Sequence, residues 1–398
     1  MKKLVIVLLA AAAVFAGCTG TKKQLTDRDI LNLIYQQAGG ENWDENASTN
    51  WGTDAELSEW KNVKVNEEGR VTSLTLRNLK GVIPAEISGL TELKDLTLSI
   101  KNSEDDNDPA DCIPASLSEL TKLEDLSIYC SGVDATLPDL KPLTQLQSLT
   151  LSMSDSQPFP DLSGQKDLTS LDLSGFKGAI PESIFGMDKL ERLYINTSAL
   201  QGGLSPKIAN LKALKHLQID HTAGMIGSVK KPDAVLPEEI FSIENLEVIF
   251  LRAMANGGTV PAAVSKLQKV RTLNLIDLGL TGELPKELGE LSKIQSLEIY
   301  NQKLSGGIPA EIGNATTLKT LWLHNNGLTG TIPAALGKLV NLESLKLDQN
   351  QLTGKIPAEL ANCTKLGKGV FTDFSKNQLD PDVPAAVQAL EYFSKFKF

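Results

Sequence analysis

Leu342-Glu-Ser-Leu-Lys-Leu-Asp-Gln-Asn-Gln-Leu-Thr-Gly-Lys-Ile-Pro357 is a short alternating apolar segment, a turn, and an apolar residue before proline. Close variants of this unit end at thirteen prolines: Pro84, Pro114, Pro138, Pro160, Pro181, Pro206, Pro237, Pro261, Pro285, Pro309, Pro333, Pro357 and Pro384. From Pro237 to Pro357 the separation is 24 residues five times in succession. A constant period of this size indicates a solenoid, in which similar units stack on one another.

Each unit predicts one strand of a long parallel sheet. Leu345 and Leu347 occupy alternate positions and are expected to face the inside of the coil, so Lys346 between them faces outward. The glycine before the final pair allows a tight turn, and the proline stiffens the side opposite the strand. An asparagine after the strand, as at Asn350, can bond backbone groups of neighbouring turns. We therefore expect the C-terminal third, which keeps this asparagine, to be the most regular part.

These units resemble plant-type leucine-rich repeats, which occur in plant receptor-kinase ectodomains and in bacterial lipoproteins. The cysteine-paired caps of the plant receptors are not recognisable here, so the resemblance is to the bacterial lipoproteins. It implies an α/β solenoid, a right-handed superhelix with a parallel sheet on its concave face and a cap at each end. It also implies recognition of a protein or peptide on that face, with no cofactor. No nucleophile elbow, phosphate-binding glycine loop or H-E-x-x-H motif occurs, so we do not expect an enzyme.

The first residues predict export and lipidation. Lys2 and Lys3 precede an apolar stretch, 4–16, that is too short to span a bilayer, as in a secretory signal. Val14-Phe-Ala-Gly-Cys18 resembles a bacterial lipobox, in which the cysteine carries the lipid. An ordinary signal peptide is the alternative. By resemblance to lipoprotein sorting rules, Thr19 favours the outer membrane of a Gram-negative cell, facing either the periplasm or the cell surface.

The chain next predicts a cap before the repeats begin. Thr26-Asp-Arg-Asp29 is a helix start with a capping box. Three tryptophans follow, Trp43, Trp51 and Trp60, and we expect them to cover the open end of the first coil. The expected organisation is a signal peptide at 1–17, a lipid-anchored tether at 18–25, an N-terminal cap at 26–70, about thirteen coils at 71–384 and a C-terminal cap at 385–398.

Two inserts lengthen the coils, at 101–111 and near 224–233. The first is acidic, and Asp106, Asp108 and Asp111 are oxygen ligands of the kind that calcium prefers. It lacks the central glycine and late glutamate of an EF-hand loop, so a solvated loop is the simpler interpretation. Elsewhere, His216 and Asp220 share one face without a third metal ligand. We therefore expect no metal site, with calcium at the acidic insert as the alternative.

The cysteines allow one cross-link. Cys112 and Cys130 fall in consecutive coils, and an exported protein meets oxidising conditions. The two could form a disulfide if the acidic insert folds so as to bring them together. Cys363 is expected to be a small buried residue.

The outward-facing strand residues change in size along the chain. In the first repeats they are small: Ser73, Thr75, Thr97, Ser127, Ser148, Thr150, Ser152, Ser170 and Ser174. From residue 192 onward they become large, and the candidate ligand-binding residues are Arg192, Tyr194, His216, Phe250, Arg252, Glu298, Tyr300, Trp322 and His324. Aromatic and arginine side chains on a rigid sheet are typical of interface hot spots. The alternative is that large residues merely tile a curved sheet.

The net charge of the chain excludes one class of partner. The formal net charge is −10, and it becomes −12 once Lys2 and Lys3 leave with the signal peptide, which argues against nucleic acid as a partner. Binding of a protein or peptide is the function we expect. Glycan capture is a second candidate because tyrosine and tryptophan also stack on sugars. An architectural envelope protein without a specific ligand is the third.

Overall fold

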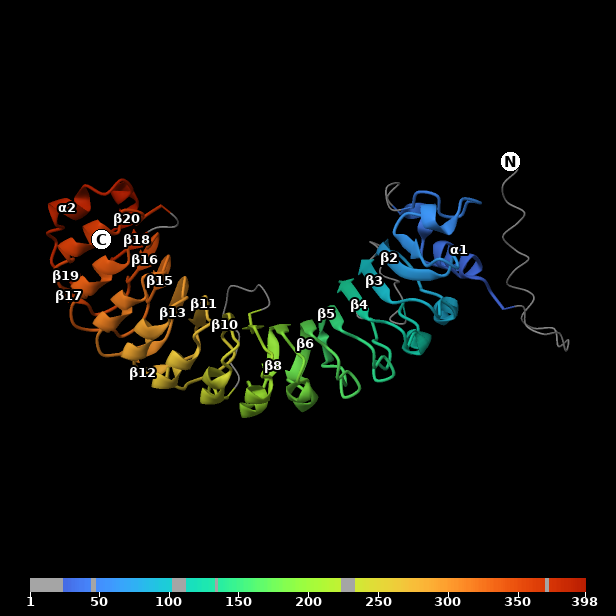
Figure 1. Ribbon diagram of the computed structural model, residues 1–398, viewed down its shortest axis with the longest axis horizontal. Coiled ribbons are helices and arrows are strands. Elements are labelled where there is room, and N and C mark those ends of the chain that lie inside the picture. Colours follow the sequence, from blue (N-terminus) through green and yellow to red (C-terminus); the bar gives the residue numbers. More distant parts are fainter. Residues whose placement is uncertain (1–23, 44–47, 102–111, 133–134, 223–232, 369–371) are drawn as a thin grey trace.

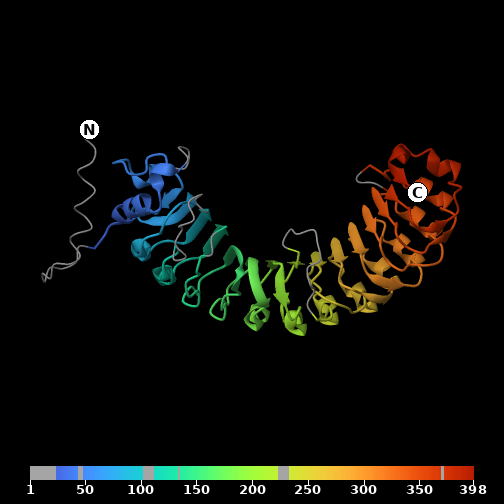
Figure 2. The same ribbon diagram turned by 180° about the vertical axis from the view of Figure 1, so that it is seen from behind.

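The computed structural model describes residues 24–43, 48–101, 112–132, 135–222, 233–368 and 372–398. The lipobox with Cys18 and the acidic residues Asp106, Asp108 and Asp111 lie outside the described residues. The described chain forms one long arc, with helix α1 at one end and strand β20 at the other (Figure 1). Figure 2 shows the same arc from behind, again with the strands on the inner side.

One parallel sheet lines the concave side of the arc. Within the described residues, thirteen parallel strands each precede one of the thirteen prolines, as the repeat predicts. They are β2 (Val71–Leu79), β3 (Asp95–Lys101), β4 (Asp125–Ser131), β5 (Ser148–Pro158), β6 (Ser170–Ala179), β7 (Arg192–Asn196), β9 (His216–Asp220), β10 (Val248–Arg252), β11 (Thr272–Ile276), β13 (Ser296–Tyr300), β15 (Thr320–Trp322), β16 (Ser344–Lys346) and β18 (Thr372–Asp373). The sheet is extended by antiparallel β1 (Val63–Val65) at its start and by parallel β20 (Phe396–Lys397) at its end.

Shorter strands pair beside the main sheet. These are β8 (Ala199–Gln201) with β6, β12 (Thr281–Glu283) with β14 (Lys303–Ser305), and β17 (Thr353–Gly354) with β19 (Gln378–Leu379).

The convex side is built from short 3₁₀ helices, one after most of the repeat prolines. They are η3 (Ala85–Gly89), η4 (Ala115–Glu119), η5 (Glu182–Gly186), η6 (Pro206–Asn210), η7 (Glu238–Ser242), η8 (Ala262–Lys266), η9 (Lys286–Glu290), η10 (Ala310–Asn314), η11 (Ala334–Lys338) and η12 (Ala358–Asn362). Proline suits this position because the first turn of a helix leaves its N–H groups unbonded. After Pro138 and Pro160, where the next repeat proline follows within 22 and 21 residues, the chain makes turns instead.

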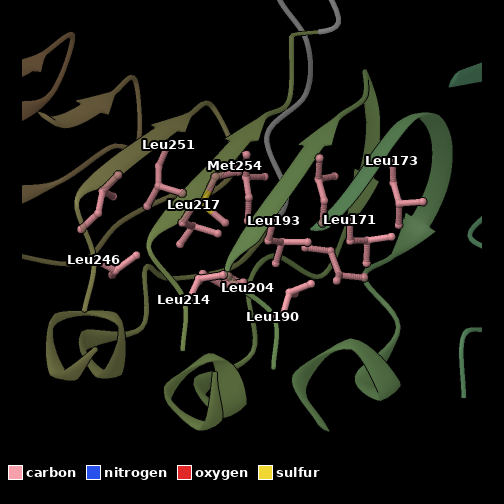
Figure 3. Packing of buried hydrophobic residues seen from close by; sticks show 14 of the residues in the cluster. Leu171, Leu173, Leu190, Leu193, Leu204, Leu214, Leu217, Leu246, Leu251 and Met254 are labelled. Carbon is pink, nitrogen blue, oxygen red and sulfur yellow. The ribbon is translucent and has the colours of Figure 1, made fainter. Parts of the chain in front are cut away.

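The core is a column of aliphatic side chains between the sheet and the convex turns. In Figure 3, Leu193, Leu217 and Leu251 come from successive strands and lie above leucines of the turns that precede them. Leu345 and Leu347 are fully buried and Lys346 is partly exposed, as the alternation predicts. Cys363 is buried, and its thiol lies 3.5 Å from the carbonyl oxygen of Leu336.

Amide side chains join neighbouring turns in the C-terminal third. The Asn350 side chain accepts from the Leu328 N–H (3.1 Å) and donates to the carbonyl oxygens of Leu323 and Leu347 (both 2.9 Å). Asn326 and Asn377 form the same kind of ladder, as the sequence predicts.

The coil of β13 uses glutamine for this purpose, which the sequence analysis did not anticipate. Gln302 Oε1 accepts from the N–H groups of Leu278 (3.0 Å) and Leu280 (2.9 Å). Its Nε2 donates to the Leu275 carbonyl at 2.9 Å. The longer side chain thus supplies the bonds that asparagine makes in later coils.

The N-terminal cap forms as predicted. In α1 (Asp27–Gln37), the Thr26 and Asp29 side chains form a reciprocal capping box. Short helices η1 (Gly40–Asn42) and η2 (Leu57–Glu59) follow. Trp43, Trp51 and Trp60 are all buried and pack on one another with ring centroids 5.2 Å apart in each contact. Each indole N–H donates to a backbone carbonyl, so these tryptophans are structural.

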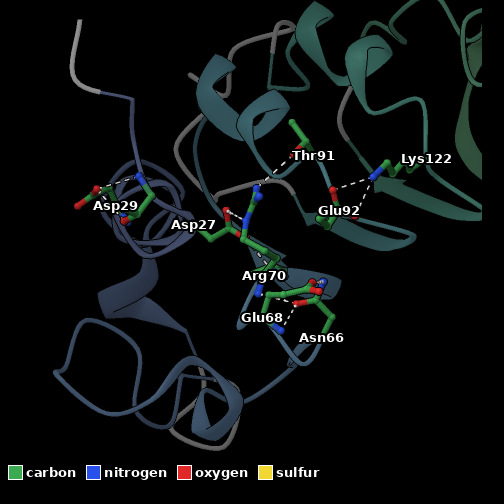
Figure 4. A network of polar contacts seen from close by, with 10 residues as sticks. Asp27, Asp29, Asn66, Glu68, Arg70, Thr91, Glu92 and Lys122 are labelled. Atoms are coloured by element: carbon green, nitrogen blue, oxygen red, sulfur yellow. Dashed lines mark hydrogen bonds and ion pairs between the residues drawn. The ribbon is translucent and has the colours of Figure 1, made fainter.

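Polar contacts attach this cap to the first coils (Figure 4). Buried Asp27 accepts from Arg70 Nε (3.0 Å) and from the Val71 N–H (2.7 Å) at the start of β2. Arg70 also donates to Thr91 Oγ1 at 3.2 Å. One carboxylate of α1 therefore fixes the cap to the sheet.

The C-terminal cap closes the other end. It contains α2 (Ala385–Gln388) and η13 (Phe393–Lys395) before β20. Phe374 of the last coil packs against Phe396 and Phe398, with ring centroids 6.3 and 5.9 Å apart. Across the part of the chain that the structure describes, no helix combines the length and apolarity needed to cross a bilayer.

Cys112 and Cys130 are both buried thiols of the first coils. Burial, together with the smaller effect of nearby Cys112, raises the pKa of Cys130 to about 12. Buried thiols with so high a pKa ionise little at neutral pH and exchange slowly. A disulfide between the two stays a prediction.

Candidate functional site

Strand register arranges the concave side chains in rows. We call the middle position the central row; it runs through Thr97, Thr150, Asp172, Tyr194, Phe250, Asn274, Glu298, Trp322 and Lys346. Glu298 pairs with Trp322, and Trp322 pairs with Lys346. A second row, two residues further along each strand, includes Arg252 and Tyr300. Arg192 and His216 lie in a third row, two residues before the central one, so the sequence-predicted candidates occupy three adjacent rows of one surface.

The first group of candidates lies on β7 and β9. Arg192 is exposed, and its Nε donates to Ser170 Oγ at 3.3 Å. The Tyr194 hydroxyl lies 3.2 Å from Nδ1 of His216. His216 therefore contacts a tyrosine of the preceding coil, and it does not share a ligand set with Asp220.

Arg252 already has a carboxylate partner, which the sequence analysis missed. Its guanidinium donates to both carboxylate oxygens of Asp220, through Nε at 2.9 Å and through Nη2. Burial alone would raise the pKa of Asp220, but the bonds from Arg252 and Thr222 outweigh it and lower that pKa. Arg252 also lies 5.8 Å from the Phe250 ring centroid. Its charge is therefore compensated within the protein.

The third group is a contiguous aromatic patch, which we define as Glu298, Tyr300, Trp322, His324 and Lys346. The Tyr300 and His324 rings are stacked, with centroids 4.2 Å apart and planes at 20°. Trp322 lies 6.1 Å from each of them. Four of the candidates, Glu298, Tyr300, Trp322 and His324, therefore lie together.

The Trp322 ring is held in place by the following coil. Its Nε1 donates to Ser344 Oγ at 2.9 Å, and Lys346 Nζ lies over the ring, 4.0 Å from the centroid. A cation at this distance is attracted to the ring face. Since the ring is fixed before any ligand arrives, binding would cost less conformational entropy than ordering a mobile side chain.

Partial burial changes the titration of the patch. Burial raises the pKa of Glu298, and hydrogen bonds from Ser296 (2.9 Å) and Asn274 and the charge of Lys346 oppose the rise. Burial also raises the pKa of Tyr300, and Glu298 adds to it. The pKa of His324 is lowered, again mainly by burial, so this ring is neutral at pH 7.

The N-terminal half of the face is not lined by small residues alone, so that prediction is partly wrong. Tyr129 on β4 is 41% exposed, and Asp95, Asp125 and Asp172 also lie in the outward rows. The alternation of Leu126 and Ile128 could have identified Tyr129 as outward-facing. No cluster of aromatic rings forms around it within the described residues.

A hollow of about 840 Å³ lies elsewhere, beside the start of α1. Its lining includes Asp27, which bonds Arg70, and Arg28, which donates to the carbonyls of Thr53 and Ala55. These contacts belong to the N-terminal cap. In the described ranges, no three histidine, cysteine or acidic side chains are grouped as a metal ion would require.

Comparison with known proteins agrees with this architecture. Residues 316–366 match the family model for leucine-rich repeats (2 copies). A TDR receptor superposes with a TM-score of 0.66 and 28% identity over 81% of this chain and 54% of its own. The plant peptide hormone receptor RGFR1, in complex with RGF2, superposes with a TM-score of 0.68 and 23% identity over 85% of this chain and 59% of its own.

A bacterial structure is also similar. A leucine-rich-repeat protein of Leptospira interrogans superposes with a TM-score of 0.52 and 22% identity, over 89% of this chain and 97% of its own. The chain spans less than two thirds of the two receptors' lengths. No curated protein sequence matches the chain. The fold is therefore that of a leucine-rich-repeat solenoid with a parallel concave sheet.

Proposed function

We propose that this protein is a non-catalytic recognition module that binds a protein or peptide at the aromatic patch of its concave face. The observation that carries the proposal is the contact of Tyr300, Trp322 and His324 with one another on adjacent strands, all partly exposed. Aromatic side chains held on a rigid sheet supply most of the binding energy in many interfaces. Similarity to a TDR receptor is in keeping with a role in recognition.

The second part of the proposal concerns location. We propose that a lipid on Cys18 tethers the solenoid to the outer membrane of a Gram-negative cell, on the periplasmic or outer side. The support is the sequence alone: a basic start, an apolar stretch and small residues before the cysteine. Replacing Cys18 with alanine should abolish incorporation of labelled palmitate and release the protein from the membrane fraction. Lipid label and membrane retention that persist in this variant would contradict the anchor.

Photo-crosslinking tests the binding face directly. A crosslinking amino acid at Thr320, on the strand that carries Trp322, should trap a protein or peptide in intact cells. The matched control is the same amino acid at Thr97, in the central row near the other end of the sheet. A polysaccharide adduct at Thr320 would favour glycan capture instead. Adducts formed at Thr97, or only at the insert 104–111, would contradict binding at the patch.

A further inference from the structure

We propose that Glu298, between the rings of the aromatic patch, anchors a cationic side chain of the ligand, a lysine or an arginine. This inference rests on the proposed function and adds the chemistry that the ligand must present. It comes from the charges of the patch, and from which of them already have partners.

Glu298 is a partly buried carboxylate without a basic partner at ion-pair distance among the described residues. Its oxygen accepts from Ser296 Oγ at 2.9 Å, and Asn274 contributes a second hydrogen bond. Both donors are neutral, so they orient the carboxylate without compensating its charge. A carboxylate held in this way is completed by a cationic hydrogen-bond donor.

The cations nearest to Glu298 have other contacts. Arg252 is paired with Asp220, two coils before. Lys346 lies over the Trp322 ring, and its charge acts on Glu298 without an ion pair between the two side chains. The position between Glu298 and Tyr300 is therefore left for a cation from outside.

The residues around Glu298 suit both the methylene groups and the charged group of a lysine or arginine side chain. Phe250 and Trp322 stand on either side of Asn274 and Glu298 in the central row, and Tyr300 lies two residues beyond Glu298. Between them Asn274 and Ile276 are only 8% and 4% exposed, so the partly exposed side chains around them form most of the surface at this point. Lysine and arginine place apolar methylenes along such surfaces while the charged head meets a carboxylate or a ring face. Lys346 on Trp322 shows that this ring accepts an ammonium group.

Charge complementarity points the same way. Asp348 follows His324 in the second row, where it is buried and accepts from Gln349 Nε2 at 3.0 Å. The chain as a whole carries a formal charge of −10. An acidic ligand segment would meet Glu298 and Asp348 without a free cation to balance it, whereas a basic segment would be attracted.

Paired peptide pools test the anchor on the full chain. One pool consists of N-acetylated, C-amidated decapeptides, random except for a central lysine or arginine. Its twin carries acetyl-lysine or citrulline at that position, which keeps the shape and removes the charge. Immobilised wild-type protein should enrich the charged pool about tenfold over its twin, the effect of one charge-assisted hydrogen bond.

Three variants locate the effect. Glu298→Gln should lose the preference for the charged pool, and Glu298→Lys should turn it toward pools with a central aspartate. Asp172→Asn is the matched control, because it removes a partly buried carboxylate of the central row five coils earlier, away from the patch. It should keep the preference. Thermal unfolding of each variant checks that the fold is intact.

The outcomes separate the anchor from the proposed function. Suppose peptides are captured and capture fails in the Tyr300→Ala, Trp322→Ala double variant, but the charged pool gains no advantage. The anchor is then wrong and the binding face stands. A preference that survives Glu298→Gln, or is lost equally in Asp172→Asn, also overturns the anchor. Capture of no peptide, or capture indifferent to the double variant, contradicts both.

Discussion

Leu345 and Leu347 are buried in the core, whereas Lys346 between them lies on the concave face. Truncating Leu345 or Leu347, both fully buried, should lower the free energy of unfolding by roughly 2–5 kcal/mol, because each change leaves a cavity between packed coils. Truncating Lys346 should cost less than about 1 kcal/mol, since it loses only its contact with the Trp322 ring. Denaturant titration compares the three variants. A larger loss for Lys346→Ala would mean that the strand register is wrong.

We predict that the partly buried carboxylate of Glu298 lowers the stability of the folded chain at neutral pH. Burial raises its pKa, so the folded chain holds the proton more tightly than the unfolded chain does, and stability falls as pH rises through the raised pKa. Glu298→Gln should therefore raise the melting temperature at about pH 7. At about pH 3.5, below the ordinary glutamate pKa, the two proteins should melt alike. Equal melting at both pH values would show that burial of this carboxylate costs nothing.

The sequence predicts which face of the sheet a residue lies on where buried and exposed positions alternate. It predicts less well which side chains form ion pairs. Trp322 and Tyr300 were identified because the two-residue period of a strand assigns each residue to a face. The Arg252–Asp220 pair was not, because the partners lie 32 residues apart and meet only through an insert-containing coil. The lack of a basic partner for Glu298 among the described residues likewise depends on which contacts the neighbouring cations make.

At the scale of elements, the turn ladder is what keeps successive coils in register. Asn350→Leu should lower the free energy of unfolding by about 2 kcal/mol, since it leaves the buried N–H of Leu328 without a partner and removes one of the two amide donors to the carbonyls of Leu323 and Leu347. Exchange of the Leu328 amide should accelerate most.

Exposed Gln351, next to Asn350, is the control for this ladder, and Gln351→Leu should change stability by less than about 0.5 kcal/mol. Equal losses in the two variants would mean that the ladder adds nothing specific to stability.

The sequence indicated the strands, both caps and the asparagine ladder, but not the 3₁₀ helices. The apolar residue followed by proline predicts a stiff turn. Whether a 3₁₀ helix forms after it depends on how many residues remain before the next strand. The coils after Pro138 and Pro160 are two to three residues shorter than the 24-residue period, and they lack this helix. Gln302 was missed because glutamine in place of asparagine works only at the distance that the neighbouring coil sets.

Across the whole molecule, the two sides of each coil differ in width. Strands pack about 4.8 Å apart, whereas a helical turn needs more room, so stacking coils bends the solenoid with its sheet inward. The arc in Figure 1 carries the strands of the sheet on its inner side, and the central row runs across these strands from Thr97 to Lys346. A ligand that lies along this surface contacts several coils at once, and the aromatic patch gives it one firm attachment.

The affinity of a ligand trapped at Thr320 for the Tyr300→Ala, Trp322→Ala double variant tests the central claim most directly. We predict a loss of at least about 2 kcal/mol, roughly thirtyfold in Kd, with a nearly unchanged melting temperature. Enlarging Thr97 and Thr150 to glutamine should leave the affinity unchanged. Full affinity in the double variant, together with loss of binding when residues 104–111 are deleted, would contradict the account and place the site on the insert.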